Sequence, residues 1–282
     1  MICVTGAAGF IGSHLVKHLL RTSELLLCDP RDPNMIHPEN LMNYLEEHPP
    51  SMIYHLGAIS STTETDTRAI SLNNIHFSCQ LLEYCLERDI PFVYASSASV
   101  YGPGKLGFFE GTIKSPLNYY AISKACFDDI VLQKIVDNSE SKIFGVRYFN
   151  VYGTNEDHKK DMASPVHKFI QQSKTGEIKI FEGSEKFFRD FVHVSDVVRI
   201  TNECHTFRPG IYNVGTGQAR SFLEIAQIIS NETGATIRVI PFPEHLRHKY
   251  QEYTCSDNDK ISNFYKLQRL KLEDGIRQVL YG

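Results

Sequence analysis

One glycine-rich turn near the start of the chain constrains the fold more than any other stretch. The run Met1-Ile2-Cys3-Val4-Thr5 has the apolar character of a buried strand, and Gly6-Ala7-Ala8-Gly9-Phe10-Ile11-Gly12 follows it, leading into a helical pattern. Between a strand and a helix, such glycines let the backbone turn tightly and approach a pyrophosphate, which the helix N-terminus attracts. We therefore expect a dinucleotide site at Gly6, Gly9 and Gly12.

The choice of dinucleotide depends on the end of the next strand, which we expect over residues 24–28. Asp29 follows this strand directly, where an acidic residue usually binds the adenosine ribose hydroxyls and favours NAD. Arg31 lies two residues further on and would instead hold a 2'-phosphate, which favours NADP. The sequence leaves both open, as it does the alternative that Arg31 is a solvated loop cation.

Further apolar runs alternate with helical patterns, which is typical of an α/β fold with a Rossmann-like, doubly wound parallel sheet. We expect strands at residues 52–56, 91–95 and 143–149. Residues 30–50 hold only one short helical pattern, so the third βα unit is shortened or absent. The expected domains are residues 1–150, with return segments near 189–215, and an interleaved, smaller α+β substrate domain at 151–282.

The C-terminal part has a less regular pattern. A helix is expected over 163–173, and strands over 178–181, 189–194 and 236–240, the second of which would return to the first domain. Ser221-Phe222-Leu223-Glu224 is a capping box that begins another helix, and Gly234 lies near its end.

A later helix carries two chemically active residues. Tyr120 and Lys124 are four residues apart, so a helix puts both on one face. Pro116 marks the helix entry, and Ile122, Cys126 and Ile130 repeat at helical spacing. An ammonium beside a phenol lowers the phenol pKa towards the range of a general acid or base.

Ser97 belongs to the same set, because it follows a strand whose carboxyl end is where open parallel sheets bind ligands. A serine there is often only a turn cap. Together with Tyr120, Lys124 and the glycine loop, however, its hydroxyl completes a hydride-transfer site, where the lysine also holds the nicotinamide ribose.

Composition narrows the classes of partner. The net charge of −4 offers no broad basic surface for nucleic acid. Seven cysteines, odd in number and without a C-x-x-C pair, indicate a reducing compartment with neither disulfides nor a metal site. We find no signal-peptide pattern and no apolar stretch of membrane-spanning length, so we expect a cytoplasmic protein without a membrane partner.

These residues resemble the extended short-chain dehydrogenase/reductase family over essentially the whole chain. The motifs are the glycine loop, Ser97-x-x-x-Tyr101-Gly102, the Tyr120/Lys124 pair and Arg147-Tyr148-Phe149-Asn150-Val151-Tyr152-Gly153. Within that family the chain is most similar to the ADP-heptose 6-epimerases of lipopolysaccharide precursor synthesis. The closer match rests on Ser60-Ser61-Thr62-Thr63-Glu64, His158-Lys159, Met162-Ala163-Ser164, Phe181-Glu182-Gly183-Ser184, Arg189-Asp190-Phe191-Val192 and Pro241-Phe242-Pro243.

The resemblance implies a tightly bound NADP or NAD, a nucleotide-diphosphate sugar substrate and a homo-oligomer. It implies that Tyr120 and Lys159 are two acid/base groups, although Lys159 lies in a charge-rich loop of the kind that is usually solvated. The expected dinucleotide contacts, beyond the glycines, are Phe10, Ile11, Asp29, Pro30, Arg31, Leu56, Gly57, Ala58, Asn73, Lys124 and Val151. The expected substrate contacts are Ser60, Ser97, Asn150, Phe181, Glu182, Gly183, Ser184, Arg189 and Tyr250.

Three other functions remain open. A UDP-sugar 4-epimerase is the nearest, because Asp161 replaces a serine that the heptose epimerases tend to have beside the sugar. A sugar-nucleotide dehydratase or reductase is less favoured, since dehydratases typically have an Asp-Glu pair after the catalytic Ser or Thr and this chain has Ala98-Ser99. A non-catalytic NAD(P)-binding sensor is disfavoured because such proteins commonly lose the tyrosine or the lysine.

Overall fold

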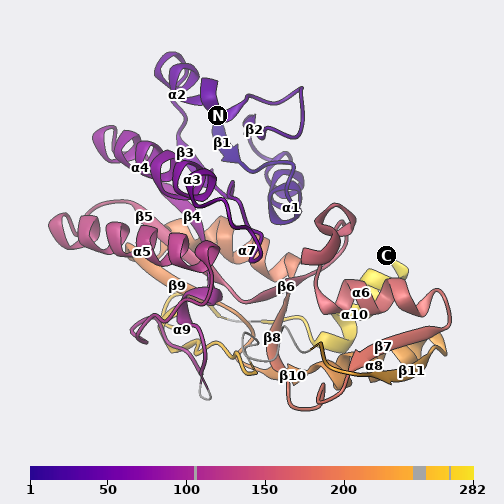
Figure 1. The fold of residues 1–282 in the computed structure, drawn as a ribbon. Coiled ribbons are helices and arrows are strands. Elements are labelled where there is room, and N and C mark those ends of the chain that lie inside the picture. Colours follow the sequence, from indigo (N-terminus) through magenta and orange to yellow (C-terminus); the bar gives the residue numbers. More distant parts are fainter. Residues whose placement is uncertain (105–106, 244–251, 267) are drawn as a thin grey trace. The chain divides into compact units, whose positions relative to one another are not determined.

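The computed structural model describes residues 1–104, 107–243, 252–266 and 268–282 (Figure 1). It divides into two compact units. The first comprises Met1–Val100, Pro116–Arg147 and Val198–Tyr212, and the second comprises Tyr101–Ser115, Tyr148–Val197 and Asn213–Gly282. The chain therefore passes between the units several times, and neither is one continuous segment.

The first unit is built around a six-stranded sheet with the order β2-β1-β3-β4-β5-β9. β1 pairs in parallel with β2 and β3, and β3 pairs in parallel with β4. This arrangement confirms the expected doubly wound sheet and brings the carboxyl ends of β1, β3 and β4 to one edge. The strands are β1 (Ile2–Thr5), β2 (Leu25–Cys28), β3 (Met52–His55), β4 (Phe92–Ser97), β5 (Ile143–Tyr148) and β9 (Gly210–Val214).

The third βα unit is reduced to a remnant, as the sequence predicted. Ile36 forms a single parallel bridge with Cys28, and its N–H donates to the Leu27 carbonyl at 2.9 Å. The chain then enters the short helix α2 (Pro38–Glu47) and returns to the other side of β1 as β3. A short extended segment and one helix therefore replace the full βα unit that would add another strand to the sheet beyond β2.

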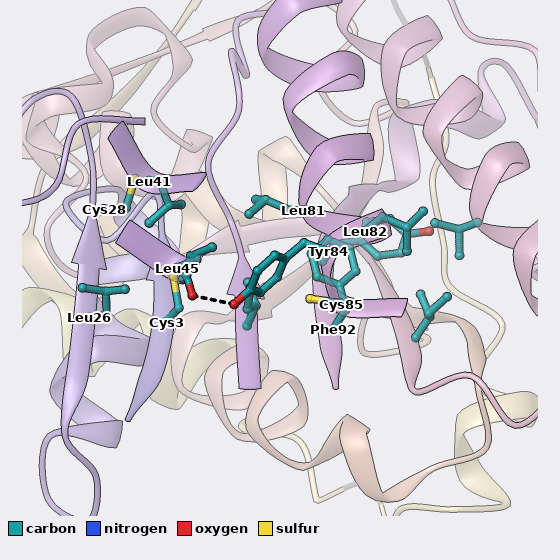
Figure 2. Packing of buried hydrophobic residues seen from close by; sticks show 14 of the residues in the cluster. Cys3, Leu26, Cys28, Leu41, Leu45, Leu81, Leu82, Tyr84, Cys85 and Phe92 are labelled. Atoms are coloured by element: carbon teal, nitrogen blue, oxygen red, sulfur yellow. Dashed lines mark hydrogen bonds between the residues drawn. The ribbon is translucent and has the colours of Figure 1, made fainter. Parts of the chain in front are cut away.

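Helices cover both faces of the sheet, which makes it doubly wound. On one face, side chains of α2, α4 (Phe77–Glu87) and α5 (Tyr119–Asp137) pack with the strands in one apolar cluster, which includes Leu45, Tyr84 and Ile53. Figure 2 shows part of this cluster, with the Tyr84 hydroxyl donating to the Leu45 carbonyl at 2.7 Å. Tyr54, the next residue along β3, points to the opposite face and donates to Asn202 of α7 (Val194–Glu203).

The helix α5 confirms the element expected around Tyr120 and Lys124. Asn118 caps it by accepting a hydrogen bond from the Ala121 N–H at 2.9 Å, so Tyr120 lies in the first turn. Ile122 and Cys126, whose spacing predicted the helix, are exposed, whereas Lys124 is buried. Apolar spacing identifies a helix, but here polar groups with strong partners are buried on the opposite side.

The helical stretch before α4 is not uniform. α3 (Thr67–Ile70) continues into a segment with the wider π-helical winding, Ser71–His76, and then into α4. Such π segments are often found at functional sites. This one buries Asn74 completely.

The second unit contains two small sheets with the orders β10-β8-β6 and β11-β7. β8 pairs with β6 and β10 inside this unit, and the segment that returns to the first unit is Val198–Tyr212. Ser221 and Glu224 form the expected capping box, and Gly234 ends the helix with a left-handed φ of 75°. The elements of this unit are β6 (Asn150–Tyr152), α6 (Pro165–Ser173), β7 (Glu177–Phe181), β8 (Phe188–His193), β10 (Ala219–Ser221), α8 (Phe222–Thr233), β11 (Thr236–Ile240), α9 (Asp259–Ser262) and α10 (Leu272–Tyr281). Short 3₁₀ turns lie at Asp157–Met162 in this unit, at Cys204–Thr206 in the first unit, and at Ala98–Tyr101, where the chain leaves the first unit.

Within the part of the chain that the structure describes, no helix has both the length and the apolar character needed to cross a membrane.

Candidate active site

The glycine loop joins β1 to α1 (Phe10–Leu19) in a geometry that side chains would block. Gly6 has a φ of 70°, and a Cβ there would lie 2.6 Å from the Gly57 nitrogen. A Cβ on Gly12 would lie 2.0 Å from the Gly6 carbonyl oxygen, so this glycine sets how closely helix and strand pack. Among the described residues no side chain caps the N-terminus of α1 at Gly9, and a helix N-terminus attracts an anion.

Asp29 and Arg31 are joined to each other at the end of β2. Arg31 donates from Nε to Oδ1 at 2.8 Å and from Nη2 to Oδ2 at 2.7 Å, and the N–H groups of Ala8 and Arg31 also donate to this carboxylate. Burial alone would raise the pKa of Asp29, but the hydrogen bonds from Arg31 hold it below its ordinary value. The Arg31 side chain is half exposed, and its Nη2 lies beside Gly9 of the glycine loop.

Ser97 and Tyr120 meet at the carboxyl end of β4. The side chains of Ser97 and Tyr120 are hydrogen-bonded to each other, and Ser97 also accepts from the hydroxyl of Ser99 at 2.9 Å. The pKa of Tyr120 is nevertheless raised, because burial outweighs the lowering by Ser97, and the Asp128 carboxylate raises it further. Tyr120 is therefore a neutral phenol at neutral pH.

Lys124 is placed as expected, one turn from Tyr120, but it does not lower the phenol pKa as the spacing suggested. Its Nζ donates to the Ala95 carbonyl of β4 at 2.8 Å, and its side chain is only 4% exposed. Burial lowers the pKa of Lys124 to about 8, and the Asp128 carboxylate opposes that shift. The lysine is thus anchored to the strand beside Ser97, and desolvation dominates the titration of both groups.

A buried polar network supports this helix from behind, and sequence reasoning missed it. Asn74 accepts from the Ile59 N–H at 2.8 Å and donates to the Ser123 hydroxyl at 3.0 Å, and Ser123 donates to the Tyr120 carbonyl. The π segment that carries Asn74 thus connects the loop after β3 to the first turn of α5. The neighbouring Asn73, which we expected near the cofactor, is exposed and donates to the Ala69 carbonyl.

The expected cofactor residues of the first unit otherwise gather around the sheet edge. Gly57 follows β3 and donates its N–H to the Thr5 hydroxyl at 3.2 Å, which places Leu56 and Ala58 next to the glycine loop. Phe10 and Ile11 form the first residues of α1. Pro30 and Ser60 are exposed in loops at the ends of β2 and β3.

Lys159 lies in the second unit, in the turn after β6, and it is held by a buried carboxylate. Its Nζ donates to Glu156 Oε2 at 2.8 Å, while its side chain stays 24% exposed. Glu156 is fully buried and also accepts from Gly153 N–H and from the N–H and hydroxyl of Ser164. Lys160, the next residue, has a φ of 48° and a ψ of −119°, a conformation that favours glycine.

The expected substrate residues of the second unit lie on the strands and turns of its small sheets. Asn150 begins β6, and its side chain accepts from the Thr254 hydroxyl at 3.4 Å. Arg189 on β8 is 7% exposed, lies 5.6 Å from the Phe222 ring and donates to the Phe188 carbonyl. The turn 181–184 follows β7, with Gly183 at a φ of 85°. Val151 lies on β6, and Tyr250 lies outside the described residues.

Comparison with known proteins decides the family. Residues 2–215 match the model of the NAD dependent epimerase/dehydratase family. The chain belongs to this family. It is 41% identical to an ADP-L-glycero-D-manno-heptose-6-epimerase of Brachyspira hyodysenteriae and 40% identical to one of Alkalilimnicola ehrlichii, in both cases over 93% of this chain and 90% of the relative. The crystal structure of the Helicobacter pylori ADP-L-glycero-D-manno-heptose-6-epimerase is similar with a TM-score of 0.84 and 29% identity, over 99% of this chain and 94% of that one.

The stretch that matches the NAD dependent epimerase/dehydratase family includes the glycine loop, Ser97, Tyr120, Lys124 and Lys159. The structure adds three buried polar residues that sequence reasoning did not select: Asn74, Asp128 and Glu156. Asn74 depends on a π-helical turn and Asp128 on partners from two strands, whereas the partners of Glu156 lie within eight residues of it. Among the described residues no group of three or more His, Cys, Asp or Glu side chains is placed to hold a metal ion.

Proposed function

We propose that this protein is an ADP-L-glycero-D-manno-heptose 6-epimerase that works by transient oxidation to a ketone and re-reduction with a bound nicotinamide dinucleotide. The observation that carries the proposal is the 41% identity to the Brachyspira hyodysenteriae enzyme of that name over 93% of the chain. The Ser97, Tyr120 and Lys124 cluster supports it, because this cluster lies in the same unit as the glycine loop.

The chain's own residues fit a dinucleotide. The glycine loop turns tightly, because a Cβ at Gly6 or Gly12 would collide with backbone atoms, and the N-terminus of α1 that follows attracts phosphates. Around it lie Phe10, Ile11, Leu56, Gly57 and Ala58. When bound, the dinucleotide supplies reversible acceptance of a hydride from a sugar carbon.

We propose NADP as the preferred cofactor, because Arg31 occupies the carboxylate that NAD would need. Both oxygens of Asp29 already accept from Arg31, and Ala8 donates to one of them. The carboxylate therefore has little remaining capacity for ribose hydroxyls. Its bidentate contact instead fixes a half-exposed guanidinium beside Gly9, where a 2'-phosphate would be recognised by charge and geometry.

Tyr120 is proposed as the acid/base group at the substrate hydroxyl. It is a neutral phenol at rest, so in the absence of ligands it is ready to donate a proton to a ketone oxygen, and acting as a base requires its pKa to fall. The hydrogen bond with Ser97 acts in that direction, since it lowers the pKa of Tyr120. A protonated Lys124, anchored to the Ala95 carbonyl, adds positive charge on the same helix face.

Lys159 is proposed as the second acid/base group, which serves the opposite face of the ketone. Its Nζ is partly exposed and is fixed by Glu156, so the ammonium has a defined position within the second unit. Arg189, Asn150 and the turn 181–184 are proposed to bind the diphosphate and the sugar. An arginine suits a diphosphate because its guanidinium can donate two parallel hydrogen bonds.

The test is conversion of ADP-L-glycero-D-manno-heptose and its C6 epimer by purified protein without external reductant, followed by proton NMR. The proposal predicts that either epimer yields the same equilibrium mixture. UDP-glucose and UDP-galactose, incubated in parallel, should remain unchanged. Interconversion of the UDP-hexoses with no change in the ADP-heptoses would reject the proposed substrate and support a UDP-sugar 4-epimerase, the alternative that Asp161 favours.

A further inference from the structure

Behind the catalytic helix lies a buried ion pair that the mechanism above does not use. Asp128 on α5 is completely buried, and Arg147 on β5 is 1% exposed. Arg147 Nε donates to Asp128 Oδ2 at 2.8 Å, and the hydroxyl of Tyr94 on β4 donates to Asp128 Oδ1 at 2.9 Å. Both carboxylate oxygens are therefore fixed, each from a different strand.

The Asp128 carboxylate lies on the same face of α5 as the catalytic residues. Asp128 follows Lys124 by four residues and Tyr120 by eight, so all three lie along one face of α5. β4 contacts two members of this row, since Tyr94 donates to Asp128 and the adjacent Ala95 carbonyl accepts from Lys124. In Figure 1, α5 is labelled beside β4 and β5, which supply these partners.

We propose that Asp128 is a positioning residue for the active site, whose fixed carboxylate keeps the buried Lys124 ammonium in its charged form. The inference rests on the proposed roles of Tyr120 and Lys124. An ammonium that is almost fully removed from water has a strong tendency to lose its proton unless a negative charge lies nearby. Asp128 supplies that charge without touching the reacting atoms.

The other charged and titratable groups around Lys124 do not supply it. His55 on β3 is buried, and burial together with the Lys124 charge lowers its pKa to about 3, so it is neutral near pH 7. Tyr120 is a neutral phenol, and Tyr94 also stays protonated because burial raises its pKa far above the usual range. Arg147 is positive. Of these groups, only Asp128 opposes the effect of burial on Lys124.

The direct test is the titration of Lys124 followed by the ¹³Cε resonance of labelled lysine, assigned with Lys124→Arg. Asp128→Asn keeps the shape and removes the charge, and we expect it to lower the Lys124 pKa by about one unit or more. Tyr94→Phe is the matched control: it removes a hydrogen bond from the same carboxylate but leaves the charge, and should shift the titration by a few tenths of a unit at most.

Turnover supplies a second readout that a purely structural role would not move. A pKa reduced from about 8 to about 7 cuts the protonated fraction of Lys124 about fivefold at pH 8 and hardly at all at pH 6. The Asp128→Asn variant should therefore lose activity at pH 8 relative to pH 6, whereas Tyr94→Phe should keep the wild-type ratio.

The proposal can still be tested if the Asp128→Asn variant is too unstable to fold. If Asp128→Asn does not fold, the double variant Asp128→Asn/Arg147→Met removes the ion pair as a unit, a replacement that buried pairs often tolerate, and it should still lower the Lys124 pKa. An unchanged Lys124 titration in whichever variant folds, or an equal shift in Tyr94→Phe, would overturn the proposal. A shifted titration in a protein that converts no ADP-heptose would instead count against the proposed function alone.

Discussion

Arg31→Ala tests whether the pairing of Arg31 with Asp29 sets the choice between NADP and NAD. The substitution removes the two donors, Nε and Nη2, that now occupy the Asp29 carboxylate. It also removes the half-exposed cation beside Gly9. A hydrogen bond to a charged group contributes about 1.5–3 kcal/mol. At 1.4 kcal/mol per tenfold, NADP affinity should fall roughly 10- to 100-fold.

The affinity for NAD should not fall when Arg31 is removed. Without Arg31 the carboxylate keeps the N–H groups of Ala8 and residue 31 but regains capacity for ribose hydroxyls. NAD affinity should therefore stay constant or rise, as measured by calorimetric titration of both cofactors into both proteins. Arg21→Ala, which changes an exposed arginine of the same unit, is the control and should leave both affinities unchanged. Equal losses for NADP and NAD in Arg31→Ala would refute the reasoning.

Four further predictions concern catalysis and stability. Tyr120→Phe removes only the hydroxyl, so turnover should fall by roughly 10²-fold or more while the melting temperature changes little; near-normal turnover would mean that another group moves the proton. Lys159→Met should abolish epimerisation but preserve NADP binding, whereas Lys160→Met should stay close to wild type; full activity of Lys159→Met would exclude the two-base mechanism. Lys160→Gly should raise unfolding stability by about 1 kcal/mol in urea titrations, because the backbone there has a φ of 48°, and a loss of stability would contradict this. Burial lowers the pKa of His55 to about 3, so the unfolded chain binds a proton between about pH 6.5 and 3 that the folded chain does not. In this range stability should fall by about 1.4 kcal/mol per pH unit from this group, and a His55→Gln variant with the wild-type acid dependence would contradict that assignment.

Much of the fold follows from sequence where its determinants are local. The glycine loop needs a strand, three glycines and a helix within twelve residues, and the structure shows steric reasons for Gly6 and Gly12. The capping box at Ser221 and the helix end at Gly234 are likewise short patterns with one backbone solution. The shortened third βα unit is visible as a stretch too poor in apolar residues to form a strand and a full helix.

The parts that sequence reasoning missed depend on partners that are distant in the chain. Ile122 and Cys126 indicated the helix correctly but are exposed, whereas its buried face carries Lys124 and Asp128, whose partners lie on β4 and β5. Polar residues at such positions look exposed until those strands are placed. The same holds for Asn74, whose burial depends on a π-helical turn.

The electrostatics of the site also differ from the expectation drawn from spacing. A lysine one turn from a tyrosine suggested a lowered phenol pKa, but the pKa of Tyr120 is raised. The spacing of residues indicates which side chains share a helix face. Whether desolvation or a neighbouring charge dominates the pKa of such a side chain depends on how deeply that face is buried. Lys124 donates to a backbone carbonyl, and this contact has no signature in the sequence.

The central claim is that C6 is inverted by transient oxidation with a cofactor that stays bound, and the fate of the C6 hydrogen tests it most directly. Purified protein is incubated in D₂O with ADP-L-glycero-D-manno-heptose, and deuterium at C6 of both epimers is measured by mass spectrometry and proton NMR. We predict epimerisation to the equilibrium mixture with no deuterium at C6, because the hydrogen leaves and returns as the same hydride. Deuterium at C6, which would show inversion by proton abstraction, or the absence of any conversion, would contradict the account.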